Sequence, residues 1–178
     1  MTALIVLFCH ATGGVEIQRE CSEFVKKNGH LLTAHFYVSK AGRLLCKAVI
    51  HAVGPIWSSG HMDEKNLLYE TVFNVVEEAN RQKFTSIALP AISTGLYRFP
   101  LQLATTIILD AVKNFMQEPS LLQRKLREVH IIDQSASVIS EFCKTAETVF
   151  GDVDNAEIVR VSASDGSTNK AETARPSQ

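Results

Sequence analysis

The chain has 178 residues, of which 46% are hydrophobic and 21% are charged, and this composition is typical of a globular domain. Its 18 Lys and Arg residues nearly balance its 19 Asp and Glu residues, so no overall positive charge favours a nucleic acid or an anionic membrane as a partner. No apolar run reaches the roughly 18 to 20 residues that span a bilayer, which excludes a transmembrane segment.

Cysteine and histidine spacing argues against a metal site and against a disulfide framework. The four cysteines, Cys9, Cys21, Cys46 and Cys143, are far apart in the sequence. We therefore expect reduced, mostly buried thiols in a cytosolic or nuclear protein. The apolar start of the chain lacks the positive region and cleavage site of a signal peptide, so we expect a buried strand or a non-native start there.

Helical and strand-like periods alternate along the first half of the chain. Apolar residues at helical spacing predict a helix over 16–28, and the Asn28-Gly29 pair ends it. Residues that favour strands predict two strands, over 30–39 and 46–53. Asp63 is expected to cap a further helix, whose glutamates Glu64, Glu70, Glu77 and Glu78 would mostly face water.

The alternation continues in the second half. A strand is predicted over 85–92, a helix beginning near Pro100, a strand over 128–133 and a last helix capped by Ser135. Beyond Gly151 the apolar period fades and polar residues predominate, which predicts a flexible tail or linker. Such alternation indicates an α/β sandwich around a largely parallel sheet, with ligands bound beyond the carboxyl ends of the strands.

The strongest local motif is LPAISTGLYRFP at residues 89–100, a strand that leads through small residues into a helix. Gly95 permits a positive φ and a close backbone approach, and successive amides of residues 93–97 could bind one anion at the positive end of the helix. The segment lacks the P-loop and Rossmann glycine patterns. By pattern alone it remains either a phosphate site or an ordinary tight turn.

Together with VIHAVGP at residues 49–55, this motif resembles the macrodomain, the ADP-ribose-binding module. The neighbouring segments ATGGVEIQREC and KAGRLLCKAVIH are similar to the tandem macrodomains of vertebrate macro-type ADP-ribosyltransferases. The resemblance implies a three-layer α/β/α sandwich with a mixed, largely parallel sheet. It also implies a nuclear and cytoplasmic location and a link to interferon signalling and transcription.

Site residues follow from the same resemblance. It implies that Ser93, Thr94, Gly95, Leu96, Tyr97 and Phe99 bind ADP-ribose, with backbone amides on the diphosphate and the aromatic of Tyr97 or Phe99 near the distal ribose. The Arg98 side chain departs from the small residue usual there and is expected to point into solvent. The Gly54-Pro55 turn is expected to be structural, as is His51, a satisfied histidine inside an apolar strand.

The family's Asn-Ala-Asn element and glycine-rich loop have no matching residues, and Gly13-Gly14 stands in the wrong register for the loop. We therefore predict an N-terminally incomplete macrodomain over 11–150, after a non-matching start over 1–10 and before a polar tail over 151–178. Loss of strands would expose a sheet edge that a protein partner could cover. The apolar residues 4–8 could replace one lost strand.

These observations predict a non-enzymatic module that recognises ADP-ribose or ADP-ribosylated proteins, without cofactor, metal, membrane or nucleic-acid partner. A truncated scaffold that binds no ligand is the alternative. An ADP-ribosyl hydrolase is disfavoured at this stage because its chemistry needs the two elements that have no match.

Overall fold

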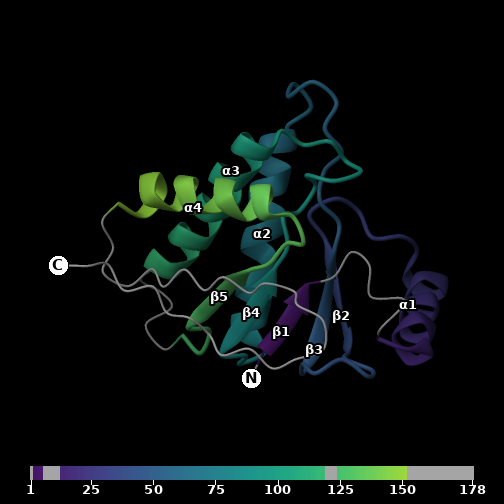
Figure 1. The fold of residues 1–178 in the computed structure, drawn as a ribbon. Helices are drawn as coiled ribbons and strands as arrows, with labels where there is room; N and C mark the ends of the chain where they lie inside the picture. The colour runs from purple at the N-terminus through teal and green to yellow at the C-terminus, as the bar shows by residue number, and fades with distance from the viewer. Residues whose placement is uncertain (1, 6–12, 119–123, 152–178) are drawn as a thin grey trace.

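The computed structural model describes residues 2–5, 13–118 and 124–151 of the chain (Figure 1). The predicted flexible tail, apart from Gly151, and part of the non-matching start lie outside these ranges. The elements follow in the order β1 (Thr2–Ile5), α1 (Val15–Asn28), β2 (Phe36–Lys40), β3 (Ala48–Ala52), α2 (Glu64–Arg81), β4 (Ser86–Leu89), α3 (Leu101–Gln117), β5 (Glu128–Ile131) and α4 (Ala136–Phe150).

The strands form one sheet in the order β2-β3-β1-β4-β5. β1 is parallel to both β3 and β4, β4 is parallel to β5, and β2 alone runs antiparallel, against β3. The prediction of a mixed, largely parallel sheet is thus confirmed. Residues 2–5 occupy its centre, so the apolar start does supply a strand, in agreement with the expectation for that segment.

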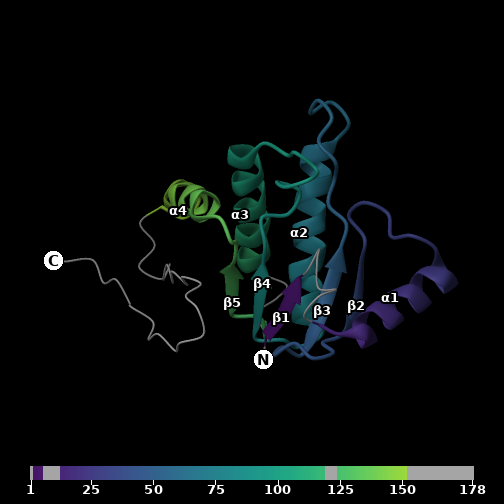
Figure 2. The same ribbon diagram turned by 45° about the vertical axis from the view of Figure 1, so that its right-hand side comes forward.

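Helices lie on both faces of the sheet, as a three-layer arrangement requires. α2 and α3 lie side by side, and α4 lies next to α3 (Figures 1 and 2). Ile50 of β3 and Ile87 and Leu89 of β4 belong to the core cluster with these helices. On the opposite face Tyr37 of β2 stacks on Phe24 of α1, with ring centroids 4.1 Å apart.

The ends of several elements differ from the sequence predictions. The first predicted strand begins only at Phe36, because residues 33–34 form a turn in which Ala34 has φ 65° and donates its N–H to the Val53 carbonyl. Asp63 and Ser135 do precede helices, but neither side chain makes a capping hydrogen bond. The prediction that these two side chains cap the helices is therefore wrong.

Two of the four α2 glutamates expected to face water are buried, namely Glu64 and Glu78. Glu78 is held by Arg81, whose Nε and Nη2 donate to the two carboxylate oxygens at 2.7 and 2.8 Å. The helical spacing predicted the apolar face of α2 correctly. It could not show that the preceding loop would cover Glu64, or that Arg81 at the end of the same helix would cover Glu78.

Cys21, Cys46 and Cys143 are free thiols, as expected, but each is half-buried rather than buried. Cys9 lies outside the described residues. Within the described ranges, every helix is too short or too polar to cross a membrane.

Candidate functional site

The carboxyl ends of β3, β1, β4 and β5 lie at the same edge of the sheet, because these strands are parallel. Ligands of open α/β sheets bind beyond this edge. Three described loops leave the sheet here, one of which, residues 132–135, connects β5 to α4. Residues 53–63 connect β3 to α2, and residues 90–100 connect β4 to α3.

The two motifs singled out in the sequence lie against each other at this edge. The Trp57 N–H donates to the Tyr97 carbonyl at 2.9 Å, and the Trp57 ring packs against Phe99 with centroids 4.7 Å apart. Gly54 also contacts the loop of residues 90–100, since a Cβ at this position would lie 2.3 Å from Ser93 Oγ. The Gly54-Pro55 turn is thus structural, because the absence of a side chain at Gly54 lets the two loops approach each other.

The backbone of residues 93–99, here called the 93–99 loop, is held by its own hydrogen bonds. Phe99 donates to the Ser93 carbonyl at 3.0 Å, and Arg98 donates to the Gly95 carbonyl at 2.9 Å. The N–H groups of Gly95, Leu96 and Tyr97 make no hydrogen bond to any residue that the structure describes. Three successive free amides, in the loop that leads into the N-terminus of α3, are suited to bind an anion.

The left-handed conformations of the loop fall at Ser93, with φ 67°, and at Arg98, with φ 54°. The interpretation that Gly95 supplies a positive φ is therefore wrong. What Gly95 supplies is space, because a Cβ there would meet no atom within 4 Å. The side facing away from the protein is open, which allows a ligand to approach the backbone closely.

Ser93 combines two unfavourable features. A left-handed φ is strained for a residue with a Cβ, and the buried Ser93 Oγ is without a hydrogen-bond partner among the described residues. Strain and an unsatisfied polar atom in one residue are more common at functional sites than elsewhere. They support Ser93 as a member of the candidate site.

The remaining predicted site residues differ in exposure. Leu96 is exposed, Tyr97 and Thr94 are half-buried, and Thr94 Oγ1 donates to the Ala91 carbonyl at 2.8 Å. Phe99 is only 2% exposed and packs on Trp57, so its ring supports the loop from inside. The Arg98 side chain is exposed, as the sequence led us to expect.

Glu64 fixes the loop of residues 53–63, although the sequence predicted that its side chain would face water. Its Oε1 accepts hydrogen bonds from the N–H groups of Ser58, Ser59 and Gly60 and from Ser58 Oγ, and its Oε2 accepts the Met62 N–H at 2.7 Å. Burial opposes ionisation, but these hydrogen bonds outweigh it and hold the pKa of Glu64 well below its usual range. A buried carboxylate thereby orders the segment that begins at Trp57.

We expect Glu64→Gln to lower the melting temperature at pH 7 by about 5 °C, because an amide cannot accept all of these hydrogen bonds. A depressed folded-state pKa stabilises the fold above the unfolded-state value and loses this effect as the pH falls below about 4.3. Between pH 7 and pH 3 the melting temperature should therefore fall more steeply for the parent than for Glu64→Gln. Glu77→Gln, exposed on the same helix, is the control, and equal melting temperatures at pH 7 for Glu64→Gln and the parent would contradict this role.

His51 belongs to β3, away from the 93–99 loop, and its ring faces Ser39 of β2 and Cys21 of α1. Its Nε2 donates to Ser39 Oγ at 2.8 Å, since the Ser39 hydroxyl itself donates to the Lys40 carbonyl, and Cys21 Sγ lies 3.6 Å from the same nitrogen. Burial, with a smaller contribution from Glu20, raises the pKa of Cys21. The thiol stays protonated at neutral pH, so this pair is not an activated nucleophile.

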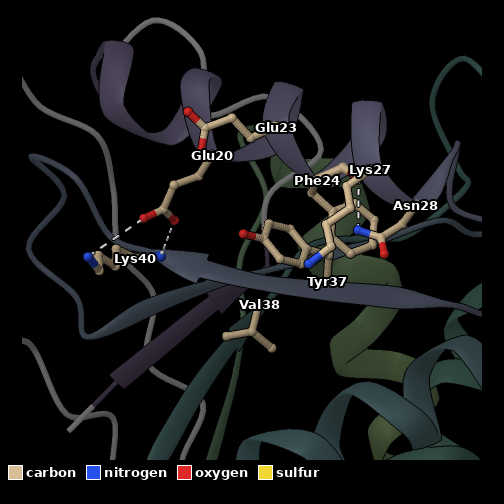
Figure 3. A pocket seen from close by; sticks show the side chains of 8 residues that line it. All are labelled: Glu20, Glu23, Phe24, Lys27, Asn28, Tyr37, Val38 and Lys40. Carbon is tan, nitrogen blue, oxygen red and sulfur yellow. Dashed lines mark hydrogen bonds and ion pairs between the residues drawn. The ribbon is translucent and has the colours of Figure 1, made fainter.

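A groove of about 490 Å³ lies between α1 and β2, lined by Phe24, Tyr37 and charged side chains of both elements (Figure 3). None of the 93–99 loop lines it. β2 is an outer strand of the sheet, and Glu20 accepts the outward N–H of Lys40 at 2.9 Å. Coverage of a sheet edge by a protein partner stays a prediction.

Gly13-Gly14 is remote from the candidate site, as its register suggested. The Gly13 carbonyl accepts the Arg43 N–H at 3.0 Å, in the turn that joins β2 to β3 at the opposite edge of the sheet. The described residues contain no group of three or more His, Cys, Asp or Glu side chains that could hold a metal ion.

An α/β sheet with an amide-lined loop at its carboxyl edge defines a class of anion- and nucleotide-binding domains. The sequence model of the Macro domain family matches residues 6–108, and the chain belongs to this family. It is 37% identical over 139 residues to the human protein mono-ADP-ribosyltransferase PARP14, which covers 77% of this chain and 8% of that protein. The resemblance to macro-type transferases is confirmed.

The fold is also that of solved macrodomains. The Oceanobacillus iheyensis macrodomain with ADP superposes with a TM-score of 0.77 at 23% identity, covering 85% of each chain. An O-acetyl-ADP-ribose deacetylase of Escherichia fergusonii is 37% identical over 112 residues, or 63% of each chain. The chain thus spans less than two thirds of the length of either curated relative.

The deacetylase match corrects one prediction. The sequence predicted a module without enzymatic activity, because two family elements have no matching residues. Relatives at 36 to 37% identity are nevertheless named as hydrolases, so enzymatic activity is compatible with membership at this level of similarity.

Proposed function

We propose that this chain binds ADP-ribose, free or attached to a protein, with the diphosphate on the 93–99 loop. The observation that carries the proposal is the row of three amides, Gly95, Leu96 and Tyr97, left without a partner among the described residues in a Macro domain. Backbone N–H groups and the N-terminal end of α3 offer partial positive charge to the phosphates.

Open space beside Gly95 and the buried hydroxyl of Ser93 support the same role. A phosphate can approach the Gly95 backbone because nothing of the protein fills the space that a Cβ would take. Tyr97, half-buried next to the free amides, is the aromatic that could reach the distal ribose. Phe99 contributes by packing under the loop.

Thermal unfolding of the purified chain with ADP-ribose tests the proposal. At about 100 times its Kd, ADP-ribose should raise the melting temperature by about 5 to 10 °C. Adenosine, which lacks the diphosphate, should have a much smaller effect at equal concentration. No shift with millimolar ADP-ribose would favour the alternative, a scaffold that binds no ligand.

Hydrolysis of O-acetyl-ADP-ribose is a second candidate function, favoured by the names of the bacterial relatives. Water would add to the acetyl carbonyl, and acetate would leave with ADP-ribose as the other product. Chromatography of O-acetyl-ADP-ribose incubated with the chain should show ADP-ribose forming faster than in buffer. A rate equal to that in buffer, from protein that binds ADP-ribose, would leave binding as the function.

A nuclear and cytoplasmic location is proposed with this function. The free thiols of Cys21, Cys46 and Cys143 fit a reducing compartment, which is also what the sequence resemblance implies. Fluorescence microscopy of a tagged chain would test it, and accumulation in the secretory pathway would contradict it.

A further inference from the structure

Large hydrophobic side chains exposed to water are few in the described residues, and their placement is uneven. They are Val15, Leu32, Leu45, Ile56, Met62, Leu96 and Ile132. Single exposed apolar residues are normal on a protein surface, but a group of them on one side indicates a contact surface.

Five of the seven lie at the carboxyl edge of the sheet. Ile56 and Met62 follow β3, at 66% and 71% exposed, and Leu96 follows β4, at 81%. Ile132 follows β5 and donates its N–H to the Leu89 carbonyl at 2.9 Å, next to the start of the 93–99 loop. Leu32 is at this edge because it precedes the antiparallel strand β2.

The other two lie elsewhere. Leu45 is fully exposed in the turn between β2 and β3, which is at the opposite edge of the sheet. Val15 begins α1 next to Gly13, whose carbonyl binds the Arg43 N–H of that same turn. The two thus share the edge that is farthest from the candidate site.

Two of these apolar residues, Ile56 and Leu96, lie next to the free amides. The hydrogen bond from the Trp57 N–H to the Tyr97 carbonyl joins the backbone next to Ile56 to the backbone next to Leu96. A diphosphate on these amides does not by itself bury the exposed apolar side chains. A polypeptide attached to the ADP-ribosyl group is a ligand that would bury them.

On the basis of the proposed function, we propose that this apolar rim, consisting of Leu32, Ile56, Met62, Leu96 and Ile132, contacts the polypeptide that carries the ADP-ribosyl group. The module then prefers modified sites flanked by apolar residues. The ADP-ribosyl group tethers the peptide, so even a weak apolar contact acts at high effective concentration. This tether is why a modified polypeptide, rather than a second copy of the chain, is the expected occupant.

Calorimetric titration with three probes tests the inference: free ADP-ribose, an ADP-ribosylated peptide with Leu beside the modified residue, and the same peptide with Ser there. We expect about tenfold tighter binding of the Leu peptide than of the other two probes. The double variant Ile56→Ser with Met62→Ser should lose this advantage and keep its affinity for free ADP-ribose. Leu45→Ser, a matched change at the opposite edge, should behave like the parent.

The other outcomes separate the two proposals. Equal affinity for all three probes would overturn the apolar rim and leave ADP-ribose binding intact, whereas no binding of any probe would overturn both. The Leu peptide without its ADP-ribosyl group serves as a fourth probe, and equally tight binding of that peptide would show a general peptide site and overturn the inference. So would a dimer, detected by sedimentation, that the double variant dissociates.

Discussion

Gly95→Glu is expected to weaken ADP-ribose binding at least about 100-fold. The new side chain would extend into the open space beside the free amides and place a carboxylate next to the diphosphate. Two like charges about 4 Å apart repel by roughly 4 kcal/mol near a protein surface, which alone corresponds to a large loss of affinity. Isothermal titration with ADP-ribose measures the loss directly.

The fold of this variant should be unaffected, because a Cβ at residue 95 meets no atom within 4 Å and Gly95 does not adopt a left-handed φ. Its melting temperature without ligand should stay within about 2 °C of the parent value. Gly95→Gln separates charge from size, since it has nearly the same volume without the carboxylate. Binding within tenfold of the parent by Gly95→Glu, in folded protein, would show that the diphosphate lies elsewhere.

Gly54→Val is expected to destabilise the chain by about 2 to 3 kcal/mol and to lower ADP-ribose affinity. A Cβ at this position would lie 2.3 Å from Ser93 Oγ and 2.7 Å from Ile92 Cγ2, so the 93–99 loop must move to admit it. Both neighbours are short, buried side chains with little freedom to turn away. Denaturant unfolding gives the stability change, and titration gives the change in affinity.

Gly95→Ala is the matched control for this glycine, because it adds a Cβ to the same pair of loops at a point with free space. It should cost less than about 0.5 kcal/mol. If Gly54→Val were as stable as Gly95→Ala, the close contact between the two loops would not be essential to the fold, and Gly54 would lose its structural role.

The sequence predicted the elements around the site well, because each is set by local pattern. Helical spacing identified α1 and α2, and small residues before a helix identified the 93–99 loop. Failures occurred where contacts outside the regular elements determined the local structure. Residues 30–35 have the composition of a strand but form a turn against Val53. Glu64 begins the amphipathic helix α2 and is buried by the backbone of residues 58–62, the loop directly before it.

What the sequence alone determined is the α/β fold, the family and the segment offered to an anion, since periodicity and motif spacing are properties of neighbouring residues. Only the tertiary structure showed that Gly54 packs on Ser93, that Phe99 is buried under Trp57 and that five exposed hydrophobic residues share one edge. The first two relations join residues 39 and 42 positions apart, and the five exposed residues span 100 positions of the sequence. These relations depend on strand order and direction, which bring separate loops to the same edge of the sheet and which no local pattern encodes.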